Sequence, residues 1–428
     1  MKQNMNKIIR NILSITLIII VLSSSALAKY ILVPMDEAQK DHLKSYGVAY
    51  SVLGFDKEVE WLLNYRGGSF MFEHYDEFEK LCLLRGVSFE KISSSKAQAI
   101  RNEIENPVVN ASIVKLLTVP KIAVYSPKKS QPWDDAVTMV LTYAEIPYET
   151  VFDDEVLDGK LPLYDWLHLH HEDFTGQYGK FYASFRNAPW YKEQVQEAEE
   201  IAAKHGYTKV SEMKLAVAKK IRDFTLGGGF LFAMCSATDS YDIALAADGV
   251  DICEEMFDGD PSDPAAQSKL DYSKTFAFKD FELVRDPYQY EYSDIDINPY
   301  ARNVSEETDV FVLNEFSAKW DVVPTILTQN HDRVVKGFMG QTTAFRTEKV
   351  KSNTIILGEN KSLEEVRYLH GTLGKGTWTF YGGHDPEDYR HMVEEPPTDL
   401  ALYPNSPGYR LILNNILFPS AKKEKQKT

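Results

Sequence analysis

The segment that most constrains the fold is a wholly apolar run, Phe230–Met234, which follows three glycines at 227–229. Strands with one exposed face alternate apolar and polar residues, whereas strands buried on both faces are apolar throughout. Strands of the second kind lie in the middle of parallel sheets whose faces are covered by helices. The run therefore predicts a central strand of a parallel sheet.

Short β-rich runs and helical stretches alternate on both sides of this strand. Such alternation is typical of a parallel sheet with covering helices. We expect strands at 121–125, 148–152, 164–170 and 377–381, and helices at 133–143, 212–224 and 406–417. Further β-like runs occur at 310–313, 325–327, 334–345 and 354–357. The predicted class is α/β, with a parallel sheet, covering helices and a β-rich insertion.

Residues 29–118 repeat the pattern on a smaller scale. Strands are expected at 30–33, 59–65 and 87–92, with helices at 75–85 and 95–104. The same alternation predicts a second parallel sheet, and Thr118-Val119-Pro120 is the expected boundary. The predicted domains are a small α/β domain at 29–118, a larger domain at 119–420 with its insertion at about 254–350, and a basic tail at 421–428.

The first 28 residues have the pattern of a secretory signal peptide. Lys2, Lys7 and Arg10 precede an apolar run at 12–22, and Ala26-Leu27-Ala28 is a small-x-small cleavage site. The apolar run is shorter than the roughly 20 residues that a transmembrane helix needs. We therefore expect an exported protein, periplasmic or secreted, without a stable membrane span.

Composition excludes several classes of protein. The net charge is −16, and no long basic run is present that could displace the counterions of a nucleic acid. We therefore expect no nucleic-acid partner. Three cysteines cannot form a disulfide framework in a chain of 428 residues, although a pair between Cys235 and Cys253 stays open. No dinucleotide or Walker fingerprint occurs, so no cofactor is expected.

The apolar strand runs directly into Cys235, which Ala233 and Ala237 flank two residues away on either side. A nucleophile elbow has this pattern, because a strained strand-to-helix turn leaves room only for small neighbours. The backbone amide of Ser236 would then point at a developing oxyanion. A buried structural cysteine is the alternative interpretation.

A histidine and two carboxylates follow the last predicted strand, in the segment Gly382-Gly383-His384-Asp385-Pro386-Glu387. A cysteine hydrolase needs a histidine that takes the thiol proton, and a carboxylate or amide that orients the imidazole. His384, with Glu387 or Asp385, would supply both.

Together these residues resemble the class I glutamine amidotransferase-like superfamily, which includes the PfpI-like and ThuA-like proteins. The resemblance implies a flavodoxin-like sheet, Cys235 as the nucleophile, His384 as the base and an amidase-like activity. Glu387 matches the acidic residue of the family only loosely, because Asp385 lengthens the spacing by one residue. Several branches of the family bind ligands without hydrolysing them.

A polar cluster ends the strand predicted at 164–170, and it includes His168, His170, His171 and Glu172. Ligands of open α/β sheets bind at the carboxyl ends of strands, so His170, His171 and Glu172 are expected at the rim of the substrate site. A metal site built on His168 and His170 is the alternative, and His384 or His391 would have to complete it.

These patterns favour an exported cysteine-dependent hydrolase that acts on an amide in a small molecule, peptide or glycan. One alternative is a non-catalytic protein of the same fold that binds a ligand or glycan. The other is a metal-dependent hydrolase that uses the cluster from His168 to Asp173. The oligomeric state is left open.

Overall fold

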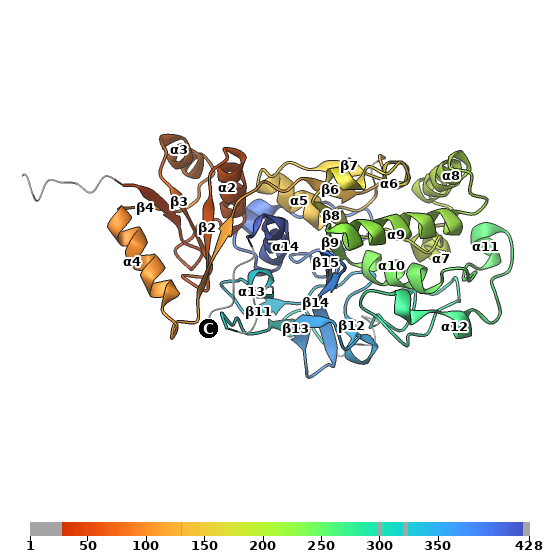
Figure 1. Cartoon of the computed structure of the whole chain (residues 1–428). Helices are drawn as coiled ribbons and strands as arrows, with labels where there is room; N and C mark the ends of the chain where they lie inside the picture. Colours follow the sequence, from red (N-terminus) through yellow and green to blue (C-terminus); the bar gives the residue numbers. More distant parts are fainter. Residues whose placement is uncertain (1–27, 130, 298–301, 303, 320–323, 423–428) are drawn as a thin grey trace, which may run out of the picture.

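The protein folds as a mixed α/β structure with two sheets (Figure 1). The computed structural model describes residues 28–129, 131–297, 302, 304–319 and 324–422. The predicted signal peptide, apart from Ala28, and nearly all of the predicted basic tail lie outside these residues. The α/β class expected from the sequence is confirmed.

The N-terminal sheet is antiparallel, so the parallel sheet predicted for this region is wrong. Its strand order is β4-β1-β3-β2-β5, and every neighbouring pair is antiparallel. The prediction overlooked β3 and β5. A turn with positive φ at Gly67 (75°) and Gly68 (89°) reverses the chain between β2 and β3, where an alternating fold would have a helix. The elements are β1 (Tyr30–Val33), α2 (His42–Gly54), β2 (Val59–Leu63), β3 (Ser69–Glu73), α3 (Asp76–Leu84), β4 (Glu90–Ile92), α4 (Ser94–Glu105) and β5 (Ser112–Leu116).

The larger sheet has a parallel half and an antiparallel half. The strands run in the order β11-β10-β13-β14-β15-β9-β8-β6-β7, and β12 pairs with β14 outside this path. All pairs from β15 to β7 are parallel. All the others are antiparallel. The parallel strands are β6 (Ile122–Tyr125), β7 (Glu149–Val151), β8 (Trp166–Leu169), β9 (Phe230–Met234) and β15 (Gly376–Tyr381). The predicted apolar strand is therefore central, as expected.

The strands of the antiparallel half are β10 (Val310–Leu313), β11 (Val334–Lys336), β12 (Phe345–Arg346), β13 (Ile355–Asn360) and β14 (Glu365–Leu373). Two predictions fail here. The run at 325–327 is part of a short helix, α13 (Pro324–Leu327), because proline favours the first turn of a helix. The run at 334–345 divides into β11 and β12, which are separated by a loop.

Helices flank the parallel half. They are α5 (Ala136–Tyr143), α6 (Asp153–Leu157), α7 (Tyr182–Phe185), α8 (Pro189–Lys204), α9 (Val210–Gly227), α10 (Ser236–Ala246), α11 (Glu255–Asp258), α12 (Ala266–Lys269) and α14 (Pro407–Leu417). In the part of the chain that the structure describes, no helix combines the length and the apolar character that a bilayer crossing requires.

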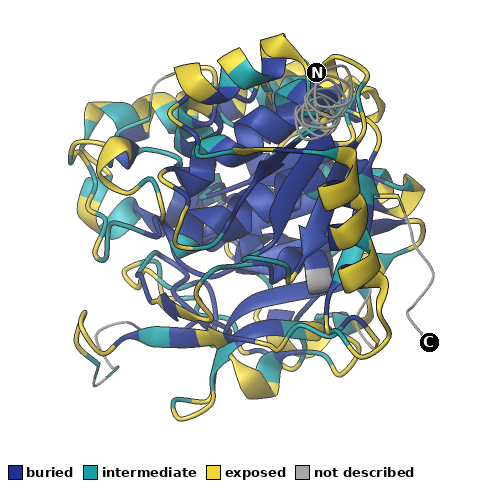
Figure 2. Ribbon diagram, turned by 90° about the vertical axis from the view of Figure 1, so that its left-hand side faces the viewer, coloured by how far each residue is buried: buried dark blue, intermediate teal, exposed yellow. Residues whose placement is uncertain are grey.

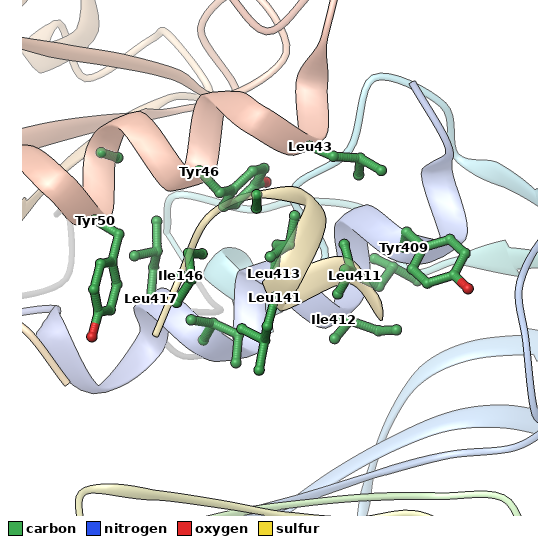
Figure 3. Close-up of a cluster of buried hydrophobic side chains, with 14 of the residues drawn as sticks. Leu43, Tyr46, Tyr50, Leu141, Ile146, Tyr409, Leu411, Ile412, Leu413 and Leu417 are labelled. Carbon is green, nitrogen blue, oxygen red and sulfur yellow. The ribbon is translucent and has the colours of Figure 1, made fainter. Parts of the chain in front are cut away.

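One buried cluster joins the N-terminal sheet to the larger one. Strands and inner helices are buried, whereas the outer faces of the peripheral helices are exposed (Figure 2). Leu43 and Tyr46 of α2 pack with Leu141 of α5 and with Leu411 and Leu413 of α14 (Figure 3). Because these side chains share one apolar core, α14 fastens the two sheets together.

Candidate active site

Cys235 occupies a strained turn between β9 and α10. Its φ is 51° and its ψ is −140°, a conformation that residues with a side chain seldom adopt. Three hydrogen bonds hold the turn. The Cys235 N–H donates to the Tyr381 carbonyl (3.3 Å), and the backbone N–H and the hydroxyl of Thr238 both donate to the Cys235 carbonyl (3.1 and 2.6 Å). Ala233 and Ala237 are completely buried beside it, so larger side chains would not fit.

The thiol of Cys235 is buried and faces backbone amides. Burial raises its pKa to about 11, although the N–H groups of Thr342, Ser236 and Gln341 act in the opposite direction by stabilising the thiolate. Gly340 lies against the sulfur, since a Cβ on this residue would be 3.0 Å from Sγ. The loop between β11 and β12 therefore forms one wall around the cysteine.

His384 follows β15 and lies against the same loop. Its backbone N–H donates to the Met339 carbonyl (2.9 Å). The ring Nε2 lies 3.2 Å from the Asp134 carbonyl oxygen and 3.3 Å from Asp134 Oδ1. Burial, reinforced by the nearby His170, lowers the pKa of His384 to about 3. The imidazole is therefore neutral at physiological pH.

Cys235 and His384 line one cavity of about 450 Å³. Trp133, His171, Gly340 and His391 contribute to its walls. Among the described residues, no hydrogen bond joins the Cys235 sulfur to the His384 ring. The two groups thus share a cavity without a hydrogen bond between them, and catalytic hydrogen bonds often form only when substrate binds.

Asp385 and Glu387 lie in the turn after His384 but point elsewhere. Asp385 is buried and accepts hydrogen bonds from the hydroxyls of Thr398 (2.6 Å) and Tyr409 (2.7 Å). Burial raises the pKa of Glu387, and a hydrogen bond from Ser406 opposes that shift. The carboxylate beside the His384 ring belongs to Asp134, not to either predicted residue.

The predicted rim residues separate into two groups. His170 and His171 pack against His384, with ring centroids 4.4 and 5.7 Å away. Glu172 lines a different, smaller cavity together with Lys214, and burial raises its pKa to about 8. Ser236 contributes its backbone N–H to the sulfur of Cys235.

His168 lies deeper than the other histidines of the cluster. It is fully buried, with Nε2 at 3.4 Å from Asp135 Oδ2. His391 stacks on His384 at 3.7 Å between ring centroids, and its Nδ1 lies 3.5 Å from Asp134 Oδ1. Five histidines and two aspartates therefore gather at the carboxyl ends of the parallel strands.

Sequence reasoning missed Asp134, Asp135 and the loop at 339–343. Asp134 and Asp135 follow β6 and precede α5, so the rule that ligands bind at the carboxyl ends of strands would have marked them. No local pattern indicates the loop.

All three cysteines are free, and the Cys253 thiol donates to the Thr175 carbonyl (3.1 Å), so no disulfide bond joins Cys235 to Cys253.

No protein-family model and no curated protein matches this sequence. Among solved structures, the chain is weakly similar to two cytoplasmic proteins of Salmonella typhimurium. For STM3548 the TM-score is 0.34 at 8% identity, and for STM1381 it is 0.33 at 11% identity. Each comparison covers 71% of this chain and 100% of the other. Likenesses this weak do not establish a shared fold.

Proposed function

We propose that this protein is an exported cysteine-dependent hydrolase that cleaves an amide bond, with Cys235 as the nucleophile and His384 as the base. The observation that carries the proposal is the positive φ of Cys235, 51°, at a strand-to-helix turn whose thiol opens onto the same cavity as His384. Backbone strain of this kind is retained at functional sites where a side chain has to point in one fixed direction.

The order of the parallel strands supports a flavodoxin-like core. Along β7-β6-β8-β9-β15, the strands numbered by their position in the chain run 2-1-3-4-5. Flavodoxin-like sheets have this order, and they bind ligands at the carboxyl ends of their strands. Cys235 follows β9 and His384 follows β15 at that edge, which is the arrangement implied by the resemblance to class I glutamine amidotransferases.

The first half of the reaction forms a thioester. Cys235 Sγ attacks the amide carbon while the thiol proton passes to His384, because a thiol with a pKa of about 11 needs a base at neutral pH. The N–H groups of Ser236, Gln341 and Thr342 stabilise the negative charge that develops beside the sulfur. The carbon–nitrogen bond then breaks, and His384 gives its proton to the departing amine.

Water completes the reaction. His384 takes a proton from water as the hydroxyl adds to the thioester, and the proton then passes to the sulfur as the acid leaves.

Both acceptors beside His384 Nε2 belong to Asp134, so Nε2 carries the ring hydrogen and Nδ1 carries the lone pair. Asp134 therefore acts as a positioning residue, the role that the sequence analysis gave to Glu387 or Asp385.

The cavity rim suggests the kind of substrate. Trp133, Phe181, Phe185 and Tyr290 supply aromatic walls, and the exposed Arg390 lies at the edge. Aromatic faces stack on sugar or other ring surfaces, and a guanidinium pairs with a carboxylate or phosphate. A small amide that carries both a ring or apolar face and an anionic group fits these walls best.

The proposed location outside the cytoplasm rests on the amino-terminal pattern alone. Lys2, Lys7 and Arg10, the apolar run at 12–22 and the Ala26-Leu27-Ala28 site together favour export. Fractionation of cells that express the full chain tests this part separately from catalysis, because a cytoplasmic hydrolase would retain its activity.

An activity screen on amides, peptides and glycans tests the proposal. The wild type is compared with Cys235→Ala, with His384→Asn, and with Cys82→Ala as a matched control in helix α3. We expect hydrolysis by the wild type and by the control and none above background by Cys235→Ala. If Cys235→Ala retains the activity, the nucleophile is wrong. Saturable ligand binding without turnover would instead favour the non-catalytic alternative.

A further inference from the structure

A second cluster lies behind the proposed catalytic pair and is not needed for its chemistry. His168 is in β8, His170 is in the segment directly after it, and Asp135 is the N-cap of α5. Asp135 Oδ1 accepts the N–H groups of Val137 (2.8 Å) and Thr138 (2.9 Å), which fixes the carboxylate. Both histidines are almost completely buried.

The hydrogen bonds of His168 reveal a missing partner. Its Nδ1 faces the Phe232 carbonyl at 3.2 Å, and since a carbonyl only accepts, Nδ1 carries the hydrogen. In the neutral ring, Nε2 then presents a lone pair toward Asp135 Oδ2 at 3.4 Å. Two lone-pair atoms that face each other in a buried place repel each other, and either a proton on Nε2 or a metal ion between the two atoms removes this repulsion.

His170 has the same deficit. In the described structure, neither of its ring nitrogens has a hydrogen-bond partner, although Nδ1 lies 3.4 Å from Asp135 Oδ1. A buried polar atom without a partner is ordinarily destabilising. His168 Nε2 is also without a hydrogen-bond partner among the described atoms. Unsatisfied nitrogens gathered around one carboxylate indicate a bound ion.

We infer that Asp135, His168 and His170 bind a divalent transition-metal ion of the zinc type. One ligand atom from each residue lies within 4.8 Å of the others, and each histidine nitrogen lies 3.4 Å from one carboxylate oxygen, His168 Nε2 from Oδ2 and His170 Nδ1 from Oδ1. Zinc bonds of about 2.0–2.1 Å in tetrahedral geometry place neighbouring ligand atoms roughly 3.3 Å apart. Two imidazoles and one carboxylate are ligands that zinc prefers, and they leave a fourth position for water.

The surroundings of His168 are those of a metal ligand. Zinc-binding histidines donate their other ring N–H to a carboxylate or carbonyl, as His168 does to Phe232. Calcium and magnesium are disfavoured because they take six or more oxygen ligands. The ion would join the end of β8 to the start of α5 and hold His170 beside His384, whose ring is 4.4 Å away.

Two other clusters in the described residues are weaker candidates. In the group of Asp251, Cys253 and Asp258, the Lys209 ammonium already pairs with both carboxylates at 2.7 and 3.1 Å. In the group of Asp134, His384 and His391, a hydrogen bond already satisfies the His384 nitrogen that faces Asp134. The Asp135 group has unsatisfied nitrogens and no competing cation.

Co²⁺ titration of the purified protein tests the inference. The protein carries an affinity tag without histidine, is stripped with a chelator and is followed by the visible absorption of tetrahedral Co²⁺. Asp135→Asn is the main variant, because asparagine also caps helices and so preserves α5 while the anionic ligand is lost. His168→Gln is the second variant. His205→Gln is the control, since His205 pairs with Asp154 outside the cluster.

We expect about one tightly bound Co²⁺ per chain in the wild type, in His205→Gln and in Cys235→Ala, and at least about tenfold weaker binding in Asp135→Asn. Zn²⁺ should displace the Co²⁺ and abolish the absorption. The inference is overturned if the wild type binds no Co²⁺, or if folded Asp135→Asn binds it as tightly as the wild type. Loss of binding in Cys235→Ala would also overturn it, because the thiol would then be a ligand.

Discussion

Gly340→Ala tests whether the loop at 339–343 sets the geometry around Cys235. A Cβ at this position would lie 2.9 Å from the backbone nitrogen of His384, 3.0 Å from Cys235 Sγ and 3.0 Å from the Gly383 carbonyl carbon. Ordinary contacts between such atoms are about 3.5–4.0 Å, so the loop has to retreat by roughly 0.5–1 Å. The substitution therefore acts on the sulfur and the histidine together.

Gly340→Ala is expected to lower both the stability of the protein and the acylation rate of Cys235. Overpacking of a close-packed site costs about 1–3 kcal/mol, and each kcal/mol lowers Tm by about 2–4 °C in a domain of 150–250 residues. A displacement of about 1 Å between reacting groups reduces rates by roughly 100-fold. We expect a fall in Tm of several degrees and a much larger relative loss in the rate at which Cys235 is acylated.

The assay measures the acylation rate of Cys235 with an activated ester, together with Tm by calorimetry. Gly54→Ala is the matched control, because no atom lies within 4 Å of its added Cβ at the end of α2. That variant should keep the acylation rate and gain up to about 1 kcal/mol of stability. If Gly340→Ala acylates and unfolds like the wild type, the loop does not control the thiol.

Two further predictions concern residues that support the site. Burial lowers the pKa of Lys180 to about 8, below the value of 10.5 expected in the unfolded chain. Between pH 8 and pH 10.5 the unfolded state therefore binds more protons than the folded state, so the unfolding free energy rises with pH. In urea titrations, the unfolding free energy of the wild type minus that of Lys180→Met should increase by roughly 3 kcal/mol from pH 7.5 to 10.5. A difference that does not change with pH would contradict this prediction. Asp242→Asn should destabilise the protein by about 2–4 kcal/mol, because the carboxylate of Asp242 accepts the N–H groups of Phe276, Ala277 and Phe278 and an amide offers only one acceptor. Tm of this variant should fall, and an unchanged Tm would show that these bonds contribute little.

The sequence was informative wherever a signal was local. The apolar run Phe230–Met234 predicted a central parallel strand, and small residues beside Cys235 predicted the turn that the structure contains. Both signals come from neighbouring residues and from sterics that operate within one strand and its turn. The N-terminal sheet was misjudged because β3 and β5 were overlooked, and without them the remaining elements alternate as in a parallel fold.

The residues that complete the site could not be found in this way. Asp134 lies 250 positions before the His384 ring that it contacts, and Gly340 reaches Cys235 from a loop between two short strands. Their proximity depends on strand order and on the path of the insertion, which no local pattern fixes. The carboxylates nearest to His384 in sequence, Asp385 and Glu387, instead stabilise the turn and the start of α14.

Peptide mass spectrometry after brief exposure to an activated ester tests the central claim most directly. The three cysteines provide an internal comparison, because burial raises the pKa of Cys82 to about 12 and that of Cys253 well above its usual range. We predict that the acyl group appears on Cys235 first and is lost with time, and that His384→Asn slows its formation by about 100-fold or more. Acylation of all three cysteines at similar rates, or a Cys235 rate that does not depend on His384, would contradict the proposed nucleophile and base.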